Sequence, residues 1–447
     1  MTDLETLAAG AVRSAMDAGA TDAECTIMEG DEFSAAVRMR EVESLKEAGS
    51  RAAGIRVLVG KNGGSSYTSD LTKEGIATMV RGAIDLAKIT SEDPFAGLPD
   101  ESDLGSRKED LALYDEAVEN METDWKIARA KRAEEVAFAT DERIQNSEGA
   151  SFDSYVGRRV FVNSRGFVGS YRTSSCGFSV SPVAKQNGSM ERDYWYTSAR
   201  AAAKLESPEI VGRRAAERAV RRLNPRKIPT QNAAVLFEPR TARSLLSDLF
   251  DAVNGGAIYR QASFLAGKLG EKIAAESLTV VDDATLPGLF GSSPFDDEGV
   301  LCRRTVVVEK GVLKSYLLNS YSARKLGLKT TGNASRGITG NAGVGPGNFF
   351  IEAGERSPES ILKRMRTGLY VTELIGGDTN TVTGDYSSGA AGMWIENGEL
   401  AYPVSEITIA GNLKRMLLDV EIASDLEFRG SIASPTLLIR EMTISGQ

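Results

Sequence analysis

The stretch SLLSDLFDAVNGG, residues 244–256, predicts an amphipathic helix with one face built for burial. Its apolar residues recur three and four positions apart, the spacing of one helix face: Leu245, Leu246, Leu249, Phe250 and Val253. Ser247, Asp248 and Asp251 share the opposite, solvated face, and the run of Asn and Gly at 254–256 is a helix stop. The helix is therefore expected to pack firmly through its apolar face, while its open face carries few residues that could take part in catalysis.

The sequence around this helix is dominated by strands. Only three helices stand out after residue 225, at 240–253, at 357–367 and near 412–419. Segments such as 306–318 and 393–404 place strand-forming residues on both sides of a glycine turn, as β-hairpins do. Strands in runs, without regular helix alternation, favour an α+β class over a doubly wound sheet. We expect a strand-rich, barrel-like domain with few helices.

The first half of the chain mixes helices with antiparallel strands. Strands are expected at 23–29 and 32–38, with a hairpin turn at 61–64. A helix is expected at 123–140, and another opens at Ser207-Pro208-Glu209, where proline suits the first helical turn. This half is therefore predicted to be an α+β domain with an antiparallel sheet.

The segment 223–229 is the predicted domain boundary. It contains two prolines and few bulky apolar residues, which is typical of a linker. A chain of 447 residues also exceeds one ordinary hydrophobic core. We predict an N-terminal α+β domain at 1–224 and a C-terminal β-rich domain at 225–447 that carries the helix 240–253.

Composition, cysteine usage and the amino terminus favour a cytoplasmic protein over a membrane protein or a secreted one. Hydrophobic residues make up 41% of the chain and charged residues 26%, as in globular proteins. No apolar run approaches the roughly 18 residues that span a bilayer, and no secretory signal is visible at the amino terminus. The three cysteines, Cys25, Cys176 and Cys302, are odd in number and far apart, which suits reduced thiols. We expect a cytoplasmic protein with no membrane contact.

Charge argues against nucleic acid as a partner. The formal net charge is -9, which repels phosphate backbones. The segment 212–227 is a local exception with seven Lys or Arg residues. Val211, Ala215 and Ala219 form an apolar stripe through it, so we predict an amphipathic helix with a solvated basic face.

The chain contains no histidine. Ordinary usage would give on the order of ten in a chain of this length. Its absence removes the commonest metal ligand and the commonest general base. A Ser-His-Asp triad, a Cys-His pair and any His-based zinc site are therefore excluded.

Several long segments are distinctive. They are YTSDLTKEGIATMVRGAIDLAKITSEDPFAGL (67–98), RIQNSEGASFDS (143–154), NGSMERDYWYTSAR (187–200), SSPFDDEGVLCRRTVVVEKGVL (292–313) and TGDYSSGAAGMWIENGELAYPVSEITIAGNLKRM (383–416). In this order they span nearly the whole chain. They resemble the TldD/PmbA family, a metalloprotease-related family formerly called "modulator of DNA gyrase", and within it the PmbA (TldE) branch.

The resemblance implies an activity and an assembly. Members are associated with cytosolic proteolysis of unfolded or small peptides, and two subunits pair to enclose a cleft or tunnel. In the TldD branch a helix carries the motif HExxxH. That motif and a distant Cys hold a metal, with the Glu as general base.

Aligned with this chain, the motif of the TldD branch falls on residues 247–252. Ser247 and Ala252 stand where the two His would be, and Asp248 stands at the Glu position. The distant Cys would fall near Ala433. Because a hydroxyl and a methyl group cannot supply the nitrogen ligands that zinc requires, we expect no metal ligand and no catalytic residue in this chain.

Two segments are candidates to line a peptide cleft. The small residues of 383–392 would let another backbone approach closely, and an aromatic-Arg pair follows the helix 240–253. The candidate contact residues are Tyr259, Arg260, Asp385, Tyr386, Ser387 and Gly389.

The favoured hypothesis is a catalytically silent subunit of a TldD-type metallopeptidase. The metal, expected to be zinc, would be held by the TldD-type partner, and this chain would complete the chamber and bind extended peptide. The alternative is a homodimeric peptide-binding or adaptor protein with no protease role. A third hypothesis is a histidine-free hydrolase using Asp385, Ser387 and a lysine, but the spacing singles out no lysine.

Overall fold

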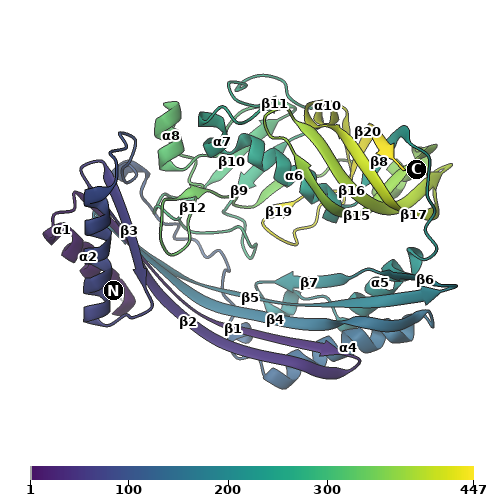
Figure 1. Ribbon diagram of the computed structural model, residues 1–447, viewed down its shortest axis with the longest axis horizontal. Helices are drawn as coiled ribbons and strands as arrows, with labels where there is room; N and C mark the ends of the chain where they lie inside the picture. Colours follow the sequence, from purple (N-terminus) through teal and green to yellow (C-terminus); the bar gives the residue numbers. More distant parts are fainter. Residues whose placement is uncertain (1–2, 447) are drawn as a thin grey trace.

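The computed structural model describes residues 3–446, which form a curved N-terminal sheet with helices on one face and a C-terminal unit built around a barrel (Figure 1). The N-terminal strands are β1 (Asp22–Arg38), β2 (Glu41–Val59), β3 (Asn62–Thr68), β4 (Ile144–Asn163), β5 (Val168–Gln186), β6 (Ser189–Arg192) and β7 (Trp195–Ala199). The helices of this unit are α1 (Asp3–Asp17), α2 (Lys73–Ile89), α3 (Glu116–Glu119), α4 (Thr123–Thr140) and α5 (Pro208–Arg221).

The N-terminal strands make one antiparallel sheet in the order β3-β2-β1-β4-β5-β6, with β7 also paired with β5. The segments 23–29 and 32–38, expected as two strands, belong to the single strand β1 of 17 residues. Gly30 lies between the two expected strands and suggests that a strand ends there, but β1 continues through it. The ring of Tyr155 occupies the space that a side chain at this position would fill. A Cβ atom at residue 30 would lie 2.6 Å from that ring.

Both pairs of long helices cover the same face of this sheet. Ala23, Cys25 and Ile27 of β1 are buried against α1 and α2, whereas Phe33 and Val37 are buried against α4 and α5. All five are odd-numbered, and alternate residues of a strand share a face. The helices therefore leave the middle of this outer face uncovered. The opposite face curves toward the C-terminal unit (Figure 1).

The C-terminal unit has short helices and many strands. Its helices are α6 (Pro239–Val253), α7 (Gly255–Tyr259), α8 (Ser320–Leu326), α9 (Pro358–Arg364) and α10 (Leu413–Leu418). Its strands are β8 (Gln231–Phe237), β9 (Val280–Asp283), β10 (Arg304–Glu309), β11 (Val312–Leu313), β12 (Ala334–Ser335), β13 (Gly343–Val344), β14 (Phe349–Ile351), β15 (Thr367–Thr379), β16 (Asp385–Glu396), β17 (Glu399–Asn412), β18 (Val420–Ile422), β19 (Ile432–Ala433) and β20 (Leu437–Ser445). Across residues 3–446, no helix is both long and apolar enough to cross a membrane.

A closed five-stranded barrel organises this unit. The strands follow the order β17-β16-β15-β8-β20, and β17 pairs with β20 to close the ring. β8 runs parallel to β15, and the other neighbours in the ring are antiparallel. The predicted α+β class with a barrel-like C-terminal domain is confirmed.

Ion pairs join the two units. Arg218 of α5 donates to both oxygens of Glu238 at 2.8 and 2.9 Å, and its Nε lies 3.2 Å from Asp193. Arg159 of β4 lies 2.9 Å from Asp297. The prediction that the helix within 212–227 presents a solvated basic face is wrong for Arg218, which is 7% exposed. Its partner Glu238 lies in the other unit.

Candidate functional site

α6 is the helix predicted at 240–253, and it forms for the expected reasons. Pro239 lies in its first turn, and it ends at Asn254, whose side chain accepts a hydrogen bond from the Gly256 N–H. Its apolar residues enter the core: Leu245, Leu246, Leu249, Phe250 and Val253. Phe250 meets Phe349 of β14 edge-on, with ring centroids 5.6 Å apart. The packing of α6 therefore holds the residues on its other face in fixed positions.

The positions aligned with the metal motif do not share one face of α6. Ser247 and Asp248 are half-buried, whereas Ala252 is fully buried in the core. Five residues of α-helix separate Ser247 from Ala252 by about 140° around the axis. Ala433 of β19 does lie beside the helix, because it lines a small cavity together with Arg243 of α6.

Asp248 faces the end of β15 and the start of β16. The pKa of Asp248 is raised to about 6, chiefly by burial and to a smaller extent by the nearby carboxylates of Asp251 and Asp378, while the hydroxyl of Thr379 opposes the shift. Tyr386 is buried beside it, and burial together with the Asp248 charge raises the pKa of Tyr386. Asp251 is exposed as expected, but the prediction that Asp248 lies on a solvated face is wrong.

The other candidates at 383–392 lie at the start of β16. Asp385 accepts hydrogen bonds from Asn412 at 2.8 Å and Thr383 at 2.7 Å, and these bonds lower its pKa. Ser387 is exposed. A Cβ atom on Gly389 would lie 2.6 Å from the Ile375 carbonyl oxygen. The backbone that approaches this glycine is therefore β15 of the same chain.

Tyr259 and Arg260 lie elsewhere, at the end of α7. The Tyr259 ring meets Tyr321 of α8 edge-on at 5.8 Å, and the Arg260 guanidinium lies 5.3 Å from the Tyr259 ring. Tyr321 in turn donates a hydrogen bond to Asp93 of the N-terminal unit at 2.8 Å. The six candidate cleft residues thus form two groups, one beside α8 and one on β16.

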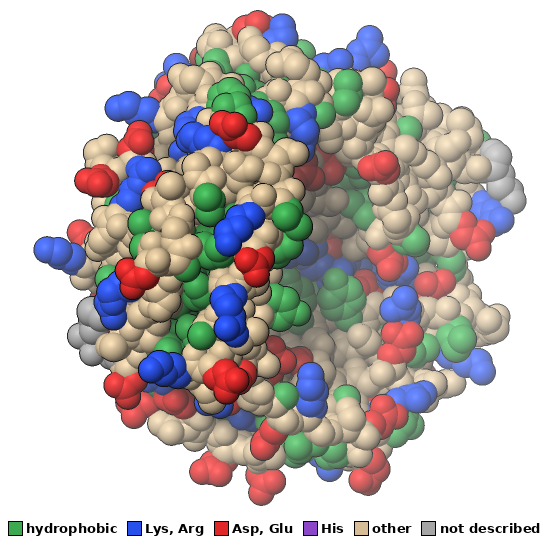
Figure 2. Space-filling view, turned by 60° about the vertical axis from the view of Figure 1, so that its left-hand side comes forward, with side chains coloured by type: hydrophobic (Ala, Val, Ile, Leu, Met, Phe, Trp, Pro, Cys, Tyr) green, Lys and Arg blue, Asp and Glu red, His purple; other side chains and the backbone are tan. Residues whose placement is uncertain are grey.

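A larger cavity lies between the two units, and none of the six candidate residues lines it. This interdomain cavity has a volume of about 720 Å³. Its floor is the inner face of the N-terminal sheet, including Ser34, Tyr155 and Ser175, and Phe290 and Arg429 of the C-terminal unit lie across from it. Figure 2 shows a hollow in one face of the molecular surface. The cavity is large enough for several residues of an extended peptide.

The floor of the interdomain cavity carries a network of hydroxyl groups around one carboxylate. Ser34 donates to Asp153 at 2.7 Å, and Ser151 donates to the other oxygen of Asp153 at 3.1 Å. The hydroxyls of Ser151 and Ser179 lie 3.2 Å apart. Groups of this kind both donate and accept hydrogen bonds, so they can satisfy the backbone of a bound peptide without selecting its sequence.

Aromatic residues form one side of the same cavity. Tyr194 and Tyr196, at the start of β7, stack with ring centroids 6.2 Å apart. Arg429 donates to the Tyr196 carbonyl at 2.9 Å and lies 4.7 Å from the Trp195 ring. This wall combines apolar ring surface with a fixed cation.

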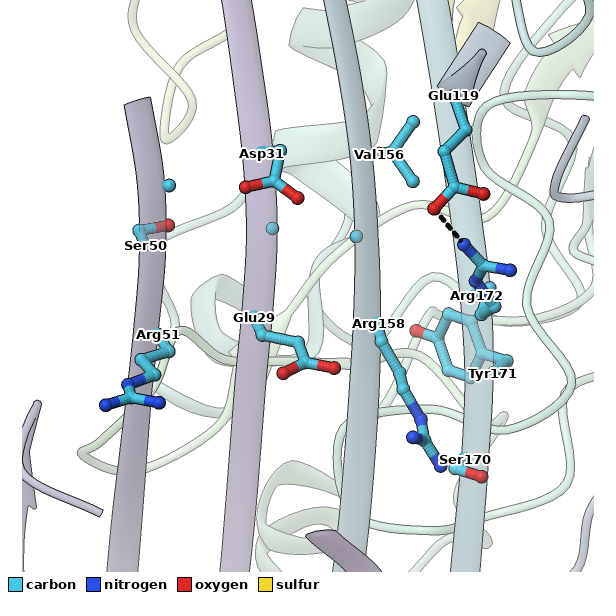
Figure 3. Close-up of a pocket in the computed structure, with 13 residues that line it drawn as sticks. Glu29, Asp31, Ser50, Arg51, Glu119, Val156, Arg158, Ser170, Tyr171 and Arg172 are labelled. Carbon is cyan, nitrogen blue, oxygen red and sulfur yellow. Dashed lines mark hydrogen bonds and ion pairs between the residues drawn. The ribbon is translucent and has the colours of Figure 1, made fainter. Parts of the chain in front are cut away.

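The outer face of the N-terminal sheet carries a second hollow, between the two helix pairs. This outer trough has a volume of about 790 Å³. A row of charged residues crosses its floor from β2 to β5, in the order Arg51, Glu29, Arg158, Arg172 (Figure 3). Arg172 is already paired with Glu119 at 2.6 Å. With Asp31 the lining carries three acidic and three Arg side chains, so its charges balance, and the trough reaches the edge of β2 at Ser50 and Arg51.

Sequence reasoning missed the interdomain cavity, although a signal was present. Along β5, Ser175, Gly177 and Ser179 alternate with buried Cys176 and Phe178. A period of two with small polar residues on one side indicates a sheet face left open to a ligand. The sequence could not show which segment of the second unit would face it.

The fold is that of known two-domain proteins. The chain matches a crystal structure of a putative modulator of DNA gyrase from Bacteroides thetaiotaomicron with a TM-score of 0.92 and 29% identity over 100% of both chains. A putative modulator of a DNA gyrase from Thermotoga maritima matches with a TM-score of 0.89 and 27% identity, over 99% of this chain and 100% of that one. TldE from Thermococcus kodakarensis, 22% identical with a TM-score of 0.88 over 98% of this chain and 100% of that one, shares the fold.

Family models and relatives identify the family. Three PmbA/TldA metallopeptidase models match in chain order: domain 1 over residues 23–87, the central domain over 116–223 and the C-terminal domain over 230–446. Metalloprotease PmbA of Escherichia coli O157:H7 is 42% identical over 95% of this chain and 92% of its own length. A PmbA homolog of Haemophilus influenzae is 38% identical over 98% and 94%. The chain belongs to the PmbA/TldD metallopeptidase family.

Proposed function

We propose that this chain is the PmbA/TldE-like, non-catalytic subunit of a cytoplasmic TldD-type metallopeptidase complex. It completes the chamber and binds unfolded or small peptides in extended form, and the TldD-type partner holds the metal and cleaves. The observation that carries the proposal is a family helix, α6, that is well packed while the positions aligned with metal ligands are a hydroxyl and a methyl group.

The residues around α6 do not fit a zinc ion. Ala252 points into the core and has no donor atom, and Ala433 also has none. Ser247 and Asp248 supply only oxygen, whereas zinc favours nitrogen and sulfur and takes at least three protein ligands. Among residues 3–446, no group of three or more Asp, Glu or Cys side chains is arranged to hold a metal ion. No catalytic step is therefore assigned to this chain.

The interdomain cavity supports the peptide-binding part of the proposal. Its floor of Ser34, Ser151 and Ser175 offers hydrogen bonds along an extended backbone, and Tyr194 offers a ring that any apolar side chain can contact. Both features bind peptide without reading a particular sequence, as degradation of varied peptides requires.

The same cavity also supports the alternative, a homodimeric peptide-binding or adaptor protein without a protease role. It lies within one chain, between the N-terminal sheet and Phe290 and Arg429, so peptide binding there needs no catalytic partner. The two proposals differ in whether a TldD-type chain binds and whether cleavage follows.

Reconstitution with a TldD-type subunit distinguishes the peptidase proposal from the adaptor alternative. The purified chain is mixed with a TldD-type subunit from the same cell, and complex formation and cleavage of an unfolded peptide are measured. We expect a heterodimer in which cleavage rises at least about tenfold over either chain alone. A mixture that forms no complex and gains no cleavage would contradict the proposal and favour the alternative.

Two controls locate the active site. Replacing both His of the partner's HExxxH motif should abolish cleavage by the complex without preventing its assembly. Replacing Ser247 of this chain by Ala should leave cleavage unchanged, because the hydroxyl is not a metal ligand in the proposal. Loss of cleavage in the S247A complex would assign α6 of this chain a catalytic part.

A further inference from the structure

Four charged side chains line the interdomain cavity, and three of them are paired with a charge of the opposite sign. Lys46 of β2 lies 3.9 Å from Glu32 of β1, and Arg429 lies 2.8 Å from Glu427. The fourth is Asp153 of β4, which is exposed and forms no ion pair within residues 3–446. The cavity therefore contains one carboxylate whose charge no described Lys or Arg side chain compensates at close range.

Asp153 lies in the floor of the cavity, away from the floor's own cation. In the sheet, Asp153 is directly opposite Ser34 of β1, and Ser34 is directly opposite Lys46 of β2. Two strand spacings, about 10 Å, therefore separate the backbones of Lys46 and Asp153. Because Lys46 also reaches toward Glu32, its charge is directed to another carboxylate.

The hydroxyl groups around Asp153 direct their protons toward it. A carboxylate oxygen only accepts hydrogen bonds, so Ser34 and Ser151 are the donors in their bonds of 2.7 and 3.1 Å. A hydroxyl group has one proton, so Ser151 has none left for Ser179, and Ser179 is the donor in the 3.2 Å contact between them. The atoms that remain free for a ligand at Asp153, Ser34 and Ser151 are therefore oxygen lone pairs.

An uncompensated carboxylate among acceptor oxygens favours a cation with several N–H donors. A primary ammonium group carries one positive charge and three donors, so it can bind Asp153 and neighbouring hydroxyl oxygens together. A backbone amide offers one donor and no charge, and an anion would be repelled. Every peptide with a free amino terminus carries a primary ammonium group, and Lys side chains carry another.

We propose that Asp153 binds a primary ammonium group of the peptide in the interdomain cavity, with the hydroxyls of Ser34 and Ser151 as additional acceptors. The inference rests on the proposed function, because it requires that this cavity binds peptide. Recognition of an amino terminus selects the end of a chain and reads no sequence. The substrate class is therefore short or unfolded peptides whose amino terminus is free and accessible.

Affinities for two forms of one peptide test the inference. The probe is a short peptide of Ala, Leu and Ser residues with an amidated carboxyl end, made with a free or an acetylated amino terminus. Acetylation removes the positive charge of the terminus and two of its three donors. Titration calorimetry with the full-length chain should show that the free form binds about tenfold more tightly, because hydrogen bonds to charged groups are stronger than neutral ones.

Two variants assign the preference to Asp153. Asp153→Asn keeps the size of the side chain but removes its charge, so the free and acetylated forms should bind this variant within about twofold of each other. Glu32→Gln is the matched control, because it removes a carboxylate from the same cavity that Lys46 already compensates. It should keep at least about fivefold preference for the free form. The acetylated form should bind all three chains equally, since the cavity itself is unchanged.

A third form of the peptide distinguishes the two sources of the ammonium group. Its amino terminus is acetylated, and one Ala is replaced by Lys. Tight binding of this form to the unmodified chain, lost in Asp153→Asn, would show that Lys side chains also occupy the site. Weak binding would restrict the site to the amino terminus. Both results support an ammonium site at Asp153 once the free form is preferred.

The failure of the inference differs from the failure of the proposed function. Equal affinities of the free and acetylated forms for the unmodified chain, or a preference that persists in Asp153→Asn, would overturn the role of Asp153 and leave the proposed function standing. If neither form binds the unmodified chain, the peptide-binding part of the proposed function is contradicted, and the role of Asp153 with it.

Discussion

The two units of this molecule deal with their strand edges in opposite ways. In the C-terminal barrel, β17 pairs with β20, so the ring has no free edge, and α6 packs its apolar face into the same core. The N-terminal sheet is open along β2, and its inner face is lined by small hydroxyl residues. Closed strands satisfy their own backbone, whereas open ones are available to another chain.

The difference indicates where function resides. The barrel belongs to a metallopeptidase family, but within residues 3–446 no group of three or more Asp, Glu or Cys side chains is arranged to hold a metal ion. The N-terminal sheet offers a cavity for peptide on one face. We therefore interpret the barrel as the structural part of this chain and the sheet as its binding part.

The largest effect on the free energy of unfolding is expected at the ion pairs that join the two units. Arg218→Ala removes the closest cation from Glu238 and Asp193, 5% exposed each, and leaves both only longer contacts, such as those of Arg240 at 3.6 and 3.8 Å. Breaking a buried ion pair costs about 3–5 kcal/mol, and the lower end of that range is expected here because Arg240 remains. Urea unfolding should show this loss, and Arg213→Ala on the exposed face of the same helix should cost less than about 0.5 kcal/mol. Equal effects of the two changes would mean that the ion pair does not join the units.

The core of the barrel comes second. Leu249→Ala empties a position of α6 that is 1% exposed, and a cavity of this kind costs about 3 kcal/mol. Unfolding followed by tryptophan fluorescence, to which the barrel residue Trp394 contributes, should report it. A loss below about 1 kcal/mol would show that α6 is not part of the barrel core.

A smaller effect is expected at Asp248, and it depends on pH. The folded-state pKa of about 6 lies above that of an unfolded Asp, so the folded chain holds the proton over the range between them. The stability that the protonated Asp248 carboxyl contributes is fully present below the pKa of an unfolded Asp. It is lost as the pH rises through about 6. Asp248→Asn should therefore stabilise the protein by about 1 kcal/mol near pH 7.5, an amount reduced by partial solvent exposure.

The same variant carries its own control. At about pH 3.5 the carboxylic acid is protonated in both states, so wild type and Asp248→Asn should be equally stable. A difference that stays constant from about pH 3.5 to pH 8 would contradict the raised pKa.

The smallest effect is expected on peptide binding in the interdomain cavity. Tyr194 lines the interdomain cavity and its side chain is 42% exposed, so Tyr194→Ala should fold normally yet bind an unfolded peptide about fivefold more weakly. Tyr67→Ala, 64% exposed on β3, is the matched control. Titration calorimetry measures both. Equal affinities would place the peptide outside the cavity.

The sequence predicted well those elements that local signals determine. α4 occupies 123–140 as predicted, and α6 starts one residue before the predicted 240 and ends at 253. Both have a continuous helical apolar stripe and a clear end. α8 was missed, although Asn319 and Ser322 form a capping box that marks its start.

The sequence failed where distant residues decide the outcome. Gly30 suggests a break, but the ring of Tyr155, from another strand, fills its place. Arg218 suggests a solvated charge, but Glu238 of the other unit buries it. Of the candidate site, Asp248 and Tyr386 are brought together, whereas Tyr259 and Arg260 lie beside α8. Such pairings require the fold, because spacing along the chain does not encode them.

The most direct test of the account is the zinc content and peptidase activity of this chain alone. The purified protein is equilibrated with excess zinc, freed of unbound metal, and assayed for bound zinc and for cleavage of an unfolded peptide. The account predicts less than about 0.1 zinc per chain and no cleavage. One zinc per chain, lost together with cleavage in the Asp248→Asn variant, would contradict it.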